Sequence, residues 1–329
     1  MKPKLIKSLL SLFVFAQLWG VTIKKIKEIN IPIQPYKACV DDNFNFYVIR
    51  YNKEYQLYKI NSKGEIVDTF ISQHGYTIDR AMTLMDIHYR EGKIYLYDIG
   101  IRRISVFDTT GKFLNSFLVS FKHLPPLNIF PFEKEIWCNS FDIEKEDEER
   151  EEGWFFHVYS NQGELIDSII KIGYPLNLAI FRALPFFVKI PDSVIVFAYP
   201  LNKIIFLNFN NKQKEEITIS DAILITGVWM VKDYCLIASF KISNTPLPQI
   251  LERMWQNNKY MEEIMERVKE LTNKDIIEEY PPIGYMLDVY NMKKKCFEVK
   301  NYPLTGEVME YKDGFLCINF NKIAIFELK

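Results

Sequence analysis

The sequence lacks the short motifs that mark the common catalytic sites. It contains no Gly-x-Ser-x-Gly nucleophile elbow, no glycine-rich phosphate loop and no His-Glu-x-x-His zinc pair. Histidine is scarce as well: 4 are found in 329 residues, namely His74, His88, His123 and His157. That number leaves little material for acid–base catalysis. These absences favour a protein that is not an enzyme, and they give no reason to expect a cofactor.

No excess of either charge is present. The 41 Lys and Arg residues face 42 Asp and Glu residues, which gives a formal net charge of −1. A surface that binds nucleic acid needs a basic excess on one face. Nucleic acid is therefore not expected as a partner.

The cysteines do not form a metal-binding pattern. None stands in a Cys-x-x-Cys or Cys/His arrangement with zinc spacing, so no metal site is expected. The odd number of five means at least one thiol outside any intramolecular disulfide. Strand-like surroundings favour buried cysteines that act as small hydrophobic side chains. The five are Cys39, Cys138, Cys235, Cys296 and Cys317.

A second long apolar run is missing, and the first lies at the N-terminus. Residues 1–7 contain three lysines, residues 8–19 are mainly apolar, and Gly20 precedes Lys24 and Lys25. A basic start, a short apolar stretch and a small residue predict a signal peptide over residues 1–20. We expect a periplasmic or extracellular, monomeric mature chain without a membrane span. The alternative is an uncleaved N-terminal membrane anchor.

What the sequence does contain is a repeated turn. Aromatic residues make up 15% of the chain and glycines number 13, a composition that favours strands. The segments 61–70, 108–117 and 160–169 each place Asn, Asp or Ser three residues before a glycine, with alternating apolar residues after it. The glycines are Gly64, Gly111 and Gly163. This pattern predicts hairpins whose glycine adopts a positive φ.

The repeats predict six units of four antiparallel strands. The units cover residues 38–71, 84–119, 127–171, 183–219, 224–301 and 306–328, and the last lacks a fourth strand. A spare strand at 22–31 completes that unit and closes a ring, which removes an exposed sheet edge. We therefore expect one all-β domain over 21–329, a six-bladed β-propeller, with five or seven blades as the alternatives.

The second unit resembles an NHL-type repeat. The resemblance rests on Gly92-Lys93-Ile94-Tyr95-Leu96-Tyr97-Asp98 and the run from Ile104 to Phe113. It extends to the exported bacterial six-bladed propellers of the TolB-like class and covers roughly half of the chain. It implies the fold and no activity. Asp98 matches the Asp that the family carries after the second strand, and we interpret it as a turn former.

Two insertions interrupt the repeat, both between the second and third strands of a unit. Residues 141–154 contain an acidic run, for which a solvated loop is the simple interpretation. Residues 241–283 contain apolar residues at helical spacing, which predicts a helical insertion. Both insertions are expected on one face of the disc. We expect that face to bind a partner protein, a peptide or a small ligand.

Candidate binding residues follow from this expectation. For a ligand they are Asp79, Arg80, Lys122, His123 and Arg182, which lie between units and could hold an anion; structural roles are the alternative. For a partner they are Met254, Trp255 and Met261, whose alternative role is packing on the propeller. The alternative function is a metal-dependent hydrolase or lyase with a central-channel site. Related calcium-dependent propellers suggest Ca²⁺ for it, with Asp86, Asn128 and Glu307 on inner strands.

Overall fold

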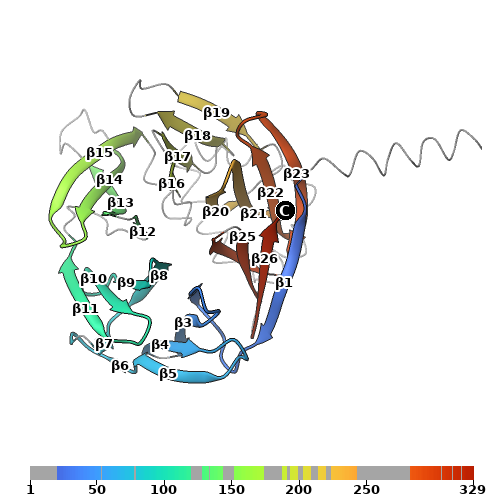
Figure 1. Cartoon of the computed structure of the whole chain (residues 1–329). Coiled ribbons are helices and arrows are strands. Elements are labelled where there is room, and N and C mark those ends of the chain that lie inside the picture. Colours follow the sequence, from blue (N-terminus) through green and yellow to red (C-terminus); the bar gives the residue numbers. More distant parts are fainter. Residues whose placement is uncertain are drawn as a thin grey trace, which may run out of the picture.

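Six four-stranded antiparallel sheets stand around a common axis, as the blades of a β-propeller do (Figure 1). The computed structural model describes residues 21–52, 54–77, 79–119, 128–132, 134–143, 152–173, 187–190, 193–198, 203–208, 214–219, 224–242, 282–304, 306–312, 314–319 and 321–329. These ranges contain no helix, and so none that could cross a membrane. The expected all-β propeller architecture is confirmed.

Each sheet runs from an inner strand at the axis to an outer strand at the rim. The four strands of a sheet are called a, b, c and d in that order. The first sheet contains β2 (Lys37–Val40), β3 (Phe46–Asn52), β4 (Glu54–Ile60) and β5 (Ile66–Ile71). The second contains β8 (Leu84–Arg90), β9 (Lys93–Asp98), β10 (Arg103–Asp108) and β11 (Phe113–Leu118). The third contains β12 (Ile129–Pro131), β13 (Glu135–Ile143), β14 (Glu152–Ser160) and β15 (Leu165–Gly173).

The other three sheets follow the same order. The fourth contains β16 (Phe187–Ile190), β17 (Ser193–Ala198), β18 (Lys203–Asn208) and β19 (Lys214–Thr218). The fifth contains β20 (Leu224–Val231), β21 (Tyr234–Ile242), β22 (Pro282–Asn291) and β23 (Cys296–Leu304). The sixth contains β24 (Glu307–Tyr311), β25 (Gly314–Asn319), β26 (Lys322–Leu328) and, as its outer strand, β1 (Ile23–Asn30).

The N-terminal strand closes the ring as expected. β1 pairs antiparallel with β26, from Ile23 opposite Leu328 to Asn30 opposite Lys322. Two further backbone hydrogen bonds, of 2.8 and 2.9 Å, join Thr22 and Lys329. Residues near both ends of the described chain are therefore held together at one sheet.

The repeated turn joins strands c and d in the first three sheets. Its first residue is Asn61, Asp108 or Ser160, whose side-chain oxygen accepts backbone N–H groups two and four residues later at 2.8–3.2 Å. The glycine three residues on has a φ of 91°, 86° or 92°. Residues with a β-carbon rarely adopt this conformation, which explains the repeated glycine. The predicted turns are confirmed.

The same glycines touch the preceding sheet. Gly111 lies under the ring of Phe70, because a β-carbon on Gly111 would come within 2.7 Å of that ring. Gly163 lies against Phe117 of β11, and Gly64 lies against the backbone carbonyl of Asn30 in β1. Figure 1 shows the outer strands following one another head to tail around the rim. The outer strands β1, β5 and β11 thus each end on the repeated turn of the next sheet.

Apolar cores lie between neighbouring sheets. One cluster joins Ile49 and Leu57 of the first sheet to Ile94, Leu96 and Phe107 of the second. Other clusters join the second sheet to the third, the fourth to the fifth, the fifth to the sixth and the sixth to the first. The first, second, fifth and sixth sheets therefore bury both faces, as stacked blades require.

The insertions depart from the expected bounds. β13 and β14 pair out to Ile143 opposite Glu152, so both ends of 141–154 are strand. β21 and β22 pair out to Ile242 opposite Pro282, so both ends of 241–283 are strand as well. The helix expected inside the second insertion lies outside the described residues, as does the signal peptide. A short parallel pair, β6 (Gln73–His74) and β7 (Arg80–Ala81), was not predicted.

Candidate functional site

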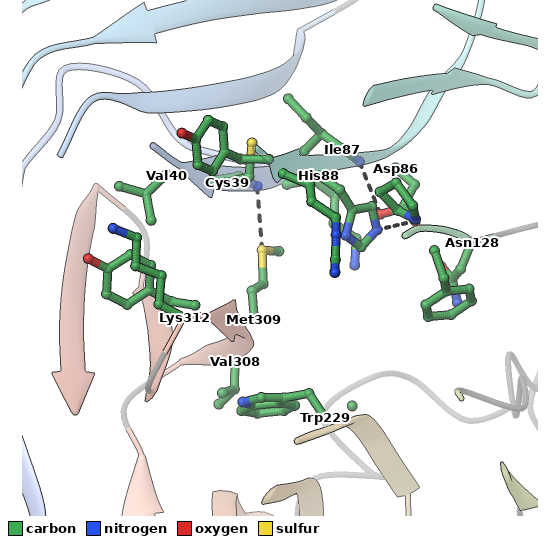
Figure 2. A pocket seen from close by; sticks show the side chains of 18 of the residues that line it. Cys39, Val40, Asp86, Ile87, His88, Asn128, Trp229, Val308, Met309 and Lys312 are labelled. Carbon is green, nitrogen blue, oxygen red and sulfur yellow. Dashed lines mark hydrogen bonds and ion pairs between the residues drawn. The ribbon is translucent and has the colours of Figure 1, made fainter. Parts of the chain in front are cut away.

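A pocket of about 170 Å³ lies where the inner strands of five sheets converge (Figure 2). β2, β8, β12, β20 and β24 contribute to it. The described residues that line it are Lys37, Ala38, Cys39, Val40, Asp86, Ile87, His88, Tyr89, Arg90, Asn128, Phe130, Pro131, Gly227, Val228, Trp229, Val308, Met309, Tyr311 and Lys312. The site is therefore an axial pocket, assembled from segments far apart in the sequence.

A buried carboxylate is the electrostatic centre of this pocket. Asp86 is 6% exposed. Its Oδ2 lies 2.9 Å from His88 Nε2 and accepts the Ile129 N–H at 2.9 Å, and its Oδ1 accepts the Ile87 N–H at 3.0 Å. Burial alone would raise the pKa of Asp86, but His88, Lys37 and the Ile129 N–H together hold it below its ordinary value. Asp86 is therefore an ionised carboxylate that joins the second sheet to the third.

His88 stands on the same strand face as Asp86, two residues further along. Its side chain is 25% exposed, and its ring centroid lies 6.2 Å from that of Phe130. An ionised carboxylate only accepts hydrogen bonds, so His88 Nε2 carries the hydrogen that it donates to Asp86. The hydrogen bond to Asp86 therefore holds the His88 ring in a fixed orientation.

The opposite wall is apolar and rigid. Figure 2 shows Trp229, Val308 and Met309 across the pocket from His88. The indole of Trp229 is 2% exposed, and its N–H donates to the Gly314 carbonyl at 3.0 Å. The Met309 sulfur accepts the backbone N–H of Ala38 at 3.4 Å. These bonds fix the wall in place before any ligand arrives.

Ion pairs surround the end of the pocket at the a–b turns. Lys312 Nζ lies 2.5 Å from Asp42 Oδ1, and the Tyr89 hydroxyl donates to Asp42 Oδ2 at 2.7 Å. The bond to Asp42 raises the pKa of Lys312, and burial together with Asp42 raises the pKa of Tyr89 to about 12. The Arg90 guanidinium lies 3.7 Å from the Glu91 carboxylate. The cations at this end are thus matched by nearby acids.

The thiol in the pocket lining is not a nucleophile. Cys39 is 7% exposed and packs with Tyr47, Ile49 and Leu57 in the core between the first two sheets. Burial raises the pKa of Cys39 well above its ordinary value, and Asp41 and Asp86 raise it further. A thiolate is the reactive form of cysteine, and this environment suppresses it.

The described lining of the pocket offers few ligands for the calcium ion of the alternative function. Ca²⁺ takes six to eight oxygen ligands, usually from several carboxylates. Among the described residues, the axial lining contributes one carboxylate, Asp86, which already accepts two backbone hydrogen bonds and contacts His88. Among the residues that the structure describes, no group of three or more His, Cys, Asp or Glu residues could hold a metal ion.

The predicted ligand residues lie away from the axial pocket or outside the residues that the structure describes. Asp79 and Arg80 lie at β7 in the connection between the first two sheets, and neither lines the pocket. Asp79 accepts the hydroxyl of Thr77 at 2.6 Å. Arg103 donates to the carbonyls of Tyr76, Thr77 and Arg80 at 3.0 Å and so fixes this connection. The other predicted ligand and partner residues lie outside the part of the chain that the structure describes; they are Lys122, His123, Arg182, Met254, Trp255 and Met261.

The sequence pointed to part of the pocket. Asp86 and Asn128, named for the alternative function, both line it, whereas the Glu307 side chain lies outside the described part of the structure. The sequence reasoning missed His88 and Lys37. A readable signal existed for His88, because residues two apart on a strand share a face. No comparable signal pointed to Lys37, which stands nearly fifty residues before Asp86.

The fold has counterparts among solved structures, whereas the sequence matches no protein-family model and no curated protein. A protein assigned as exported, from Bacteroides fragilis, aligns at 11% identity and a TM-score of 0.50, over 94% of this chain and 95% of its own. A streptogramin B lyase aligns at 12% identity and a TM-score of 0.50, over 94% of this chain and 98% of its own. A DUF4221 family member from Bacteroides vulgatus aligns at 10% identity and a TM-score of 0.50, over 94% of this chain and 98% of its own. At such low identity these likenesses show the β-propeller fold alone.

Proposed function

We propose that the protein is an exported six-bladed propeller of the NHL-repeat, TolB-like type that acts as a binding scaffold. Its partner is a protein or peptide held on the face that carries the insertions within 141–154 and 241–283. The leader-like residues 1–20 and the likeness to a protein assigned as exported support export. The six four-stranded sheets support the blade count.

One observation carries the binding role: the b–c hairpins of the third and fifth sheets are unusually long. β13 and β14 have 9 residues each, and β21 and β22 have 9 and 10. The corresponding strands of the second and fourth sheets have 6 residues each. Paired strands therefore continue into both insertions from the same face of the ring. Loops on a rigid scaffold are where binding residues concentrate.

The experiment uses a photo-crosslinking residue in the mature chain, residues 21–329. Benzoylphenylalanine replaces Met254 or Met261 in the second insertion, and Val67 in the matched control. Val67 is 53% exposed on the outer strand β5. Cells that export each variant are irradiated, and adducts are identified by mass spectrometry.

We expect the two insertion positions to label the same protein and Val67 to leave it unlabelled. Deletion of residues 244–281 should abolish that adduct at a probe placed in the other insertion, at Glu148. Circular dichroism should show that the sheets remain folded. Equal labelling of the same protein from Val67, or no specific adduct from either insertion, would contradict the proposal.

A further inference from the structure

We propose that the chain is cleaved after Gly20 and that the new N-terminal ammonium group of Val21 forms an ion pair with Glu298. This inference rests on the export that the proposed function includes, and it is independent of partner binding. Gly20 is the small residue at the end of the apolar run, where a cleavage site is expected. The structure adds the second observation, because the Glu298 carboxylate already contacts the Val21 nitrogen.

Glu298 presents a buried carboxylate at the seam of the ring. It belongs to β23, the outer strand of the fifth sheet, and its side chain is 8% exposed. Its Oε1 accepts hydrogen bonds from Asn291 Nδ2 at 2.7 Å and from Lys294 Nζ at 2.8 Å. Its Oε2 accepts the backbone N–H of Val21 at 3.1 Å. The bond from Lys294, with those from Val21 and Asn291, holds the pKa of Glu298 below its ordinary value, although burial opposes this. An ionised carboxylate therefore stands at the start of the mature chain.

The position of Val21 is fixed by its neighbours as well. Its side chain packs against the apolar cluster between the fifth and sixth sheets. Thr22 donates its N–H to the Lys329 carbonyl at 2.8 Å and accepts the Lys329 N–H at 2.9 Å. β1 begins at the next residue, Ile23, and pairs with β26. A chain that begins at Val21 keeps all of these contacts, so its terminal nitrogen remains beside the Glu298 carboxylate.

Cleavage changes the charge of this nitrogen without moving it. In the uncleaved chain it is a neutral amide. In the mature chain it is an α-amino group, whose ordinary pKa of about 7.7–8.0 makes it mainly a cation at pH 7. A hydrogen bond from an ammonium group to a carboxylate is stronger than one from an amide. Lys294, which also contacts Glu298, has a side chain that is 59% exposed, so water screens its charge. Cleavage should therefore strengthen the contact between the fifth sheet and the strand that closes the ring.

The first measurement identifies the N-terminus of the exported protein. Cells express the full chain, and the exported product is analysed by intact mass and N-terminal sequencing. We expect Val21 to be its first residue. A product that is exported but keeps residues 1–20, or begins at another residue, overturns this inference and leaves export standing. A chain that is not exported contradicts the proposed function as well.

The second measurement tests the ion pair by a double-mutant cycle on purified protein. One form of the chain begins at Val21. The other begins at Ala16, so that the Val21 nitrogen is an amide and the ammonium group lies at Ala16. Each form carries either Glu298 or Glu298→Gln, and urea unfolding gives the four equilibrium constants. Effects of residues 16–20 themselves occur in both backgrounds and cancel.

We expect Glu298→Gln to raise the unfolding equilibrium constant about fivefold more in the Val21 form than in the Ala16 form. That factor is the difference between a charged and a neutral hydrogen bond. Glu215→Gln is the matched control. Glu215 lies on β19 of the fourth sheet and pairs with Lys295 at 2.6 Å, so its replacement should have the same effect in both forms.

Equal effects of Glu298→Gln in the two forms would overturn the ion pair. If Glu298→Gln fails to fold, Lys294→Met in both forms replaces it. Lys294 and the ammonium group of Val21 repel each other across the carboxylate that they share. Removal of Lys294 should therefore enlarge the stability advantage of the Val21 form over the Ala16 form, and an unchanged or smaller advantage would overturn the proposal.

Discussion

The contact between each repeated turn and the preceding outer strand predicts an unusually sensitive glycine. We expect Gly64→Ala to destabilise the protein much more than Gly92→Ala. Both glycines have positive φ angles, 91° and 75°. A β-carbon on Gly92 would meet nothing within 4 Å, whereas one on Gly64 would come closer than 3.0 Å to the carbonyl oxygen of Asn30. Real β-carbons essentially never show such a contact.

The two substitutions share one cost and differ in another. Placing alanine in the left-handed region costs about 1–2 kcal/mol, and this applies to both positions. At Gly64 the obstructing atom belongs to the backbone of β1, so the closing strand itself must move. Overpacking of this kind typically adds about 1–3 kcal/mol. Gly64→Ala should therefore lower the free energy of unfolding by about 2–5 kcal/mol and Gly92→Ala by about 1–2 kcal/mol.

Asparagine variants separate the two costs. Asn tolerates the left-handed region better than alanine does, so Gly92→Asn should be nearly neutral. Gly64→Asn should still destabilise the protein, because its β-carbon meets the same carbonyl. Urea unfolding of the mature chain, followed by circular dichroism and fluorescence, measures all four variants. Coincident transitions establish that the free energies are comparable.

The reasoning is refuted if Gly64→Ala and Gly92→Ala lower the free energy of unfolding by equal amounts. That result would mean that β1 yields without cost, and that the repeated glycine serves only its own turn. A destabilised Gly92→Asn together with an unaffected Gly64→Asn would refute it as well, since the steric order would then be reversed.

Three further outcomes are expected. Iodoacetamide should label the native protein at Cys296 alone, because it is exposed while the other four cysteines are buried; mass spectrometry should show one label in buffer and five in urea. Asp98→Ala should cost about 2–4 kcal/mol in urea unfolding and speed exchange of the Thr83 amide, since Asp98 accepts the N–H groups of Met82, Thr83 and Gly100 at 2.8–3.0 Å. The folded-state pKa of Asp86 is depressed, so its stabilisation is complete above the unfolded-state pKa of about 4 and is lost as the pH falls through the lower folded-state pKa. The difference in stability between wild type and Asp86→Asn should therefore be full at pH 7 and should shrink as the pH falls below about 4.

The turns were predictable because their physics is local. Within five residues, Asn61 supplies the side-chain acceptor and Gly64 supplies the positive φ. Ring closure was predictable for a different reason: the count of strands left the sixth unit one short, and residues 22–31 offered the missing one. Both inferences needed only short-range patterns and a rule against exposed edges.

The repeat also contained a signal that the sequence reasoning did not use. A phenylalanine follows the turn glycine by six residues in the first two copies, as Phe70 and Phe117. Each contacts the turn glycine of the next sheet. The six-residue spacing therefore indicates a contact between blades, although we interpreted it as simple strand alternation.

The axial pocket was not predictable, because each inner strand contributes only a few side chains. Lys37, His88 and Trp229 come from three sheets and meet only once the ring is formed. Local irregularity adds to the difficulty. The pairing of β8 with β9 shifts between Leu84 and Asp86, which alters the orientation of the residues that follow. Period-two alternation alone does not show which of them reach the axis.

The positions of the two insertions follow from where the ring tolerates extra length. At a c–d turn, added residues would move a glycine such as Gly111 away from Phe70 in the outer strand of the preceding sheet. An apolar contact between the two sheets would then be lost. At an a–b turn they would disturb the ion pair of Asp42 and Lys312, which links the first and sixth sheets. A b–c hairpin can lengthen by adding paired residues, as β21 and β22 do, without moving either contact. The packing that closes the ring therefore confines new length to the face where we propose that a partner binds, and it leaves the axial pocket intact at the other end.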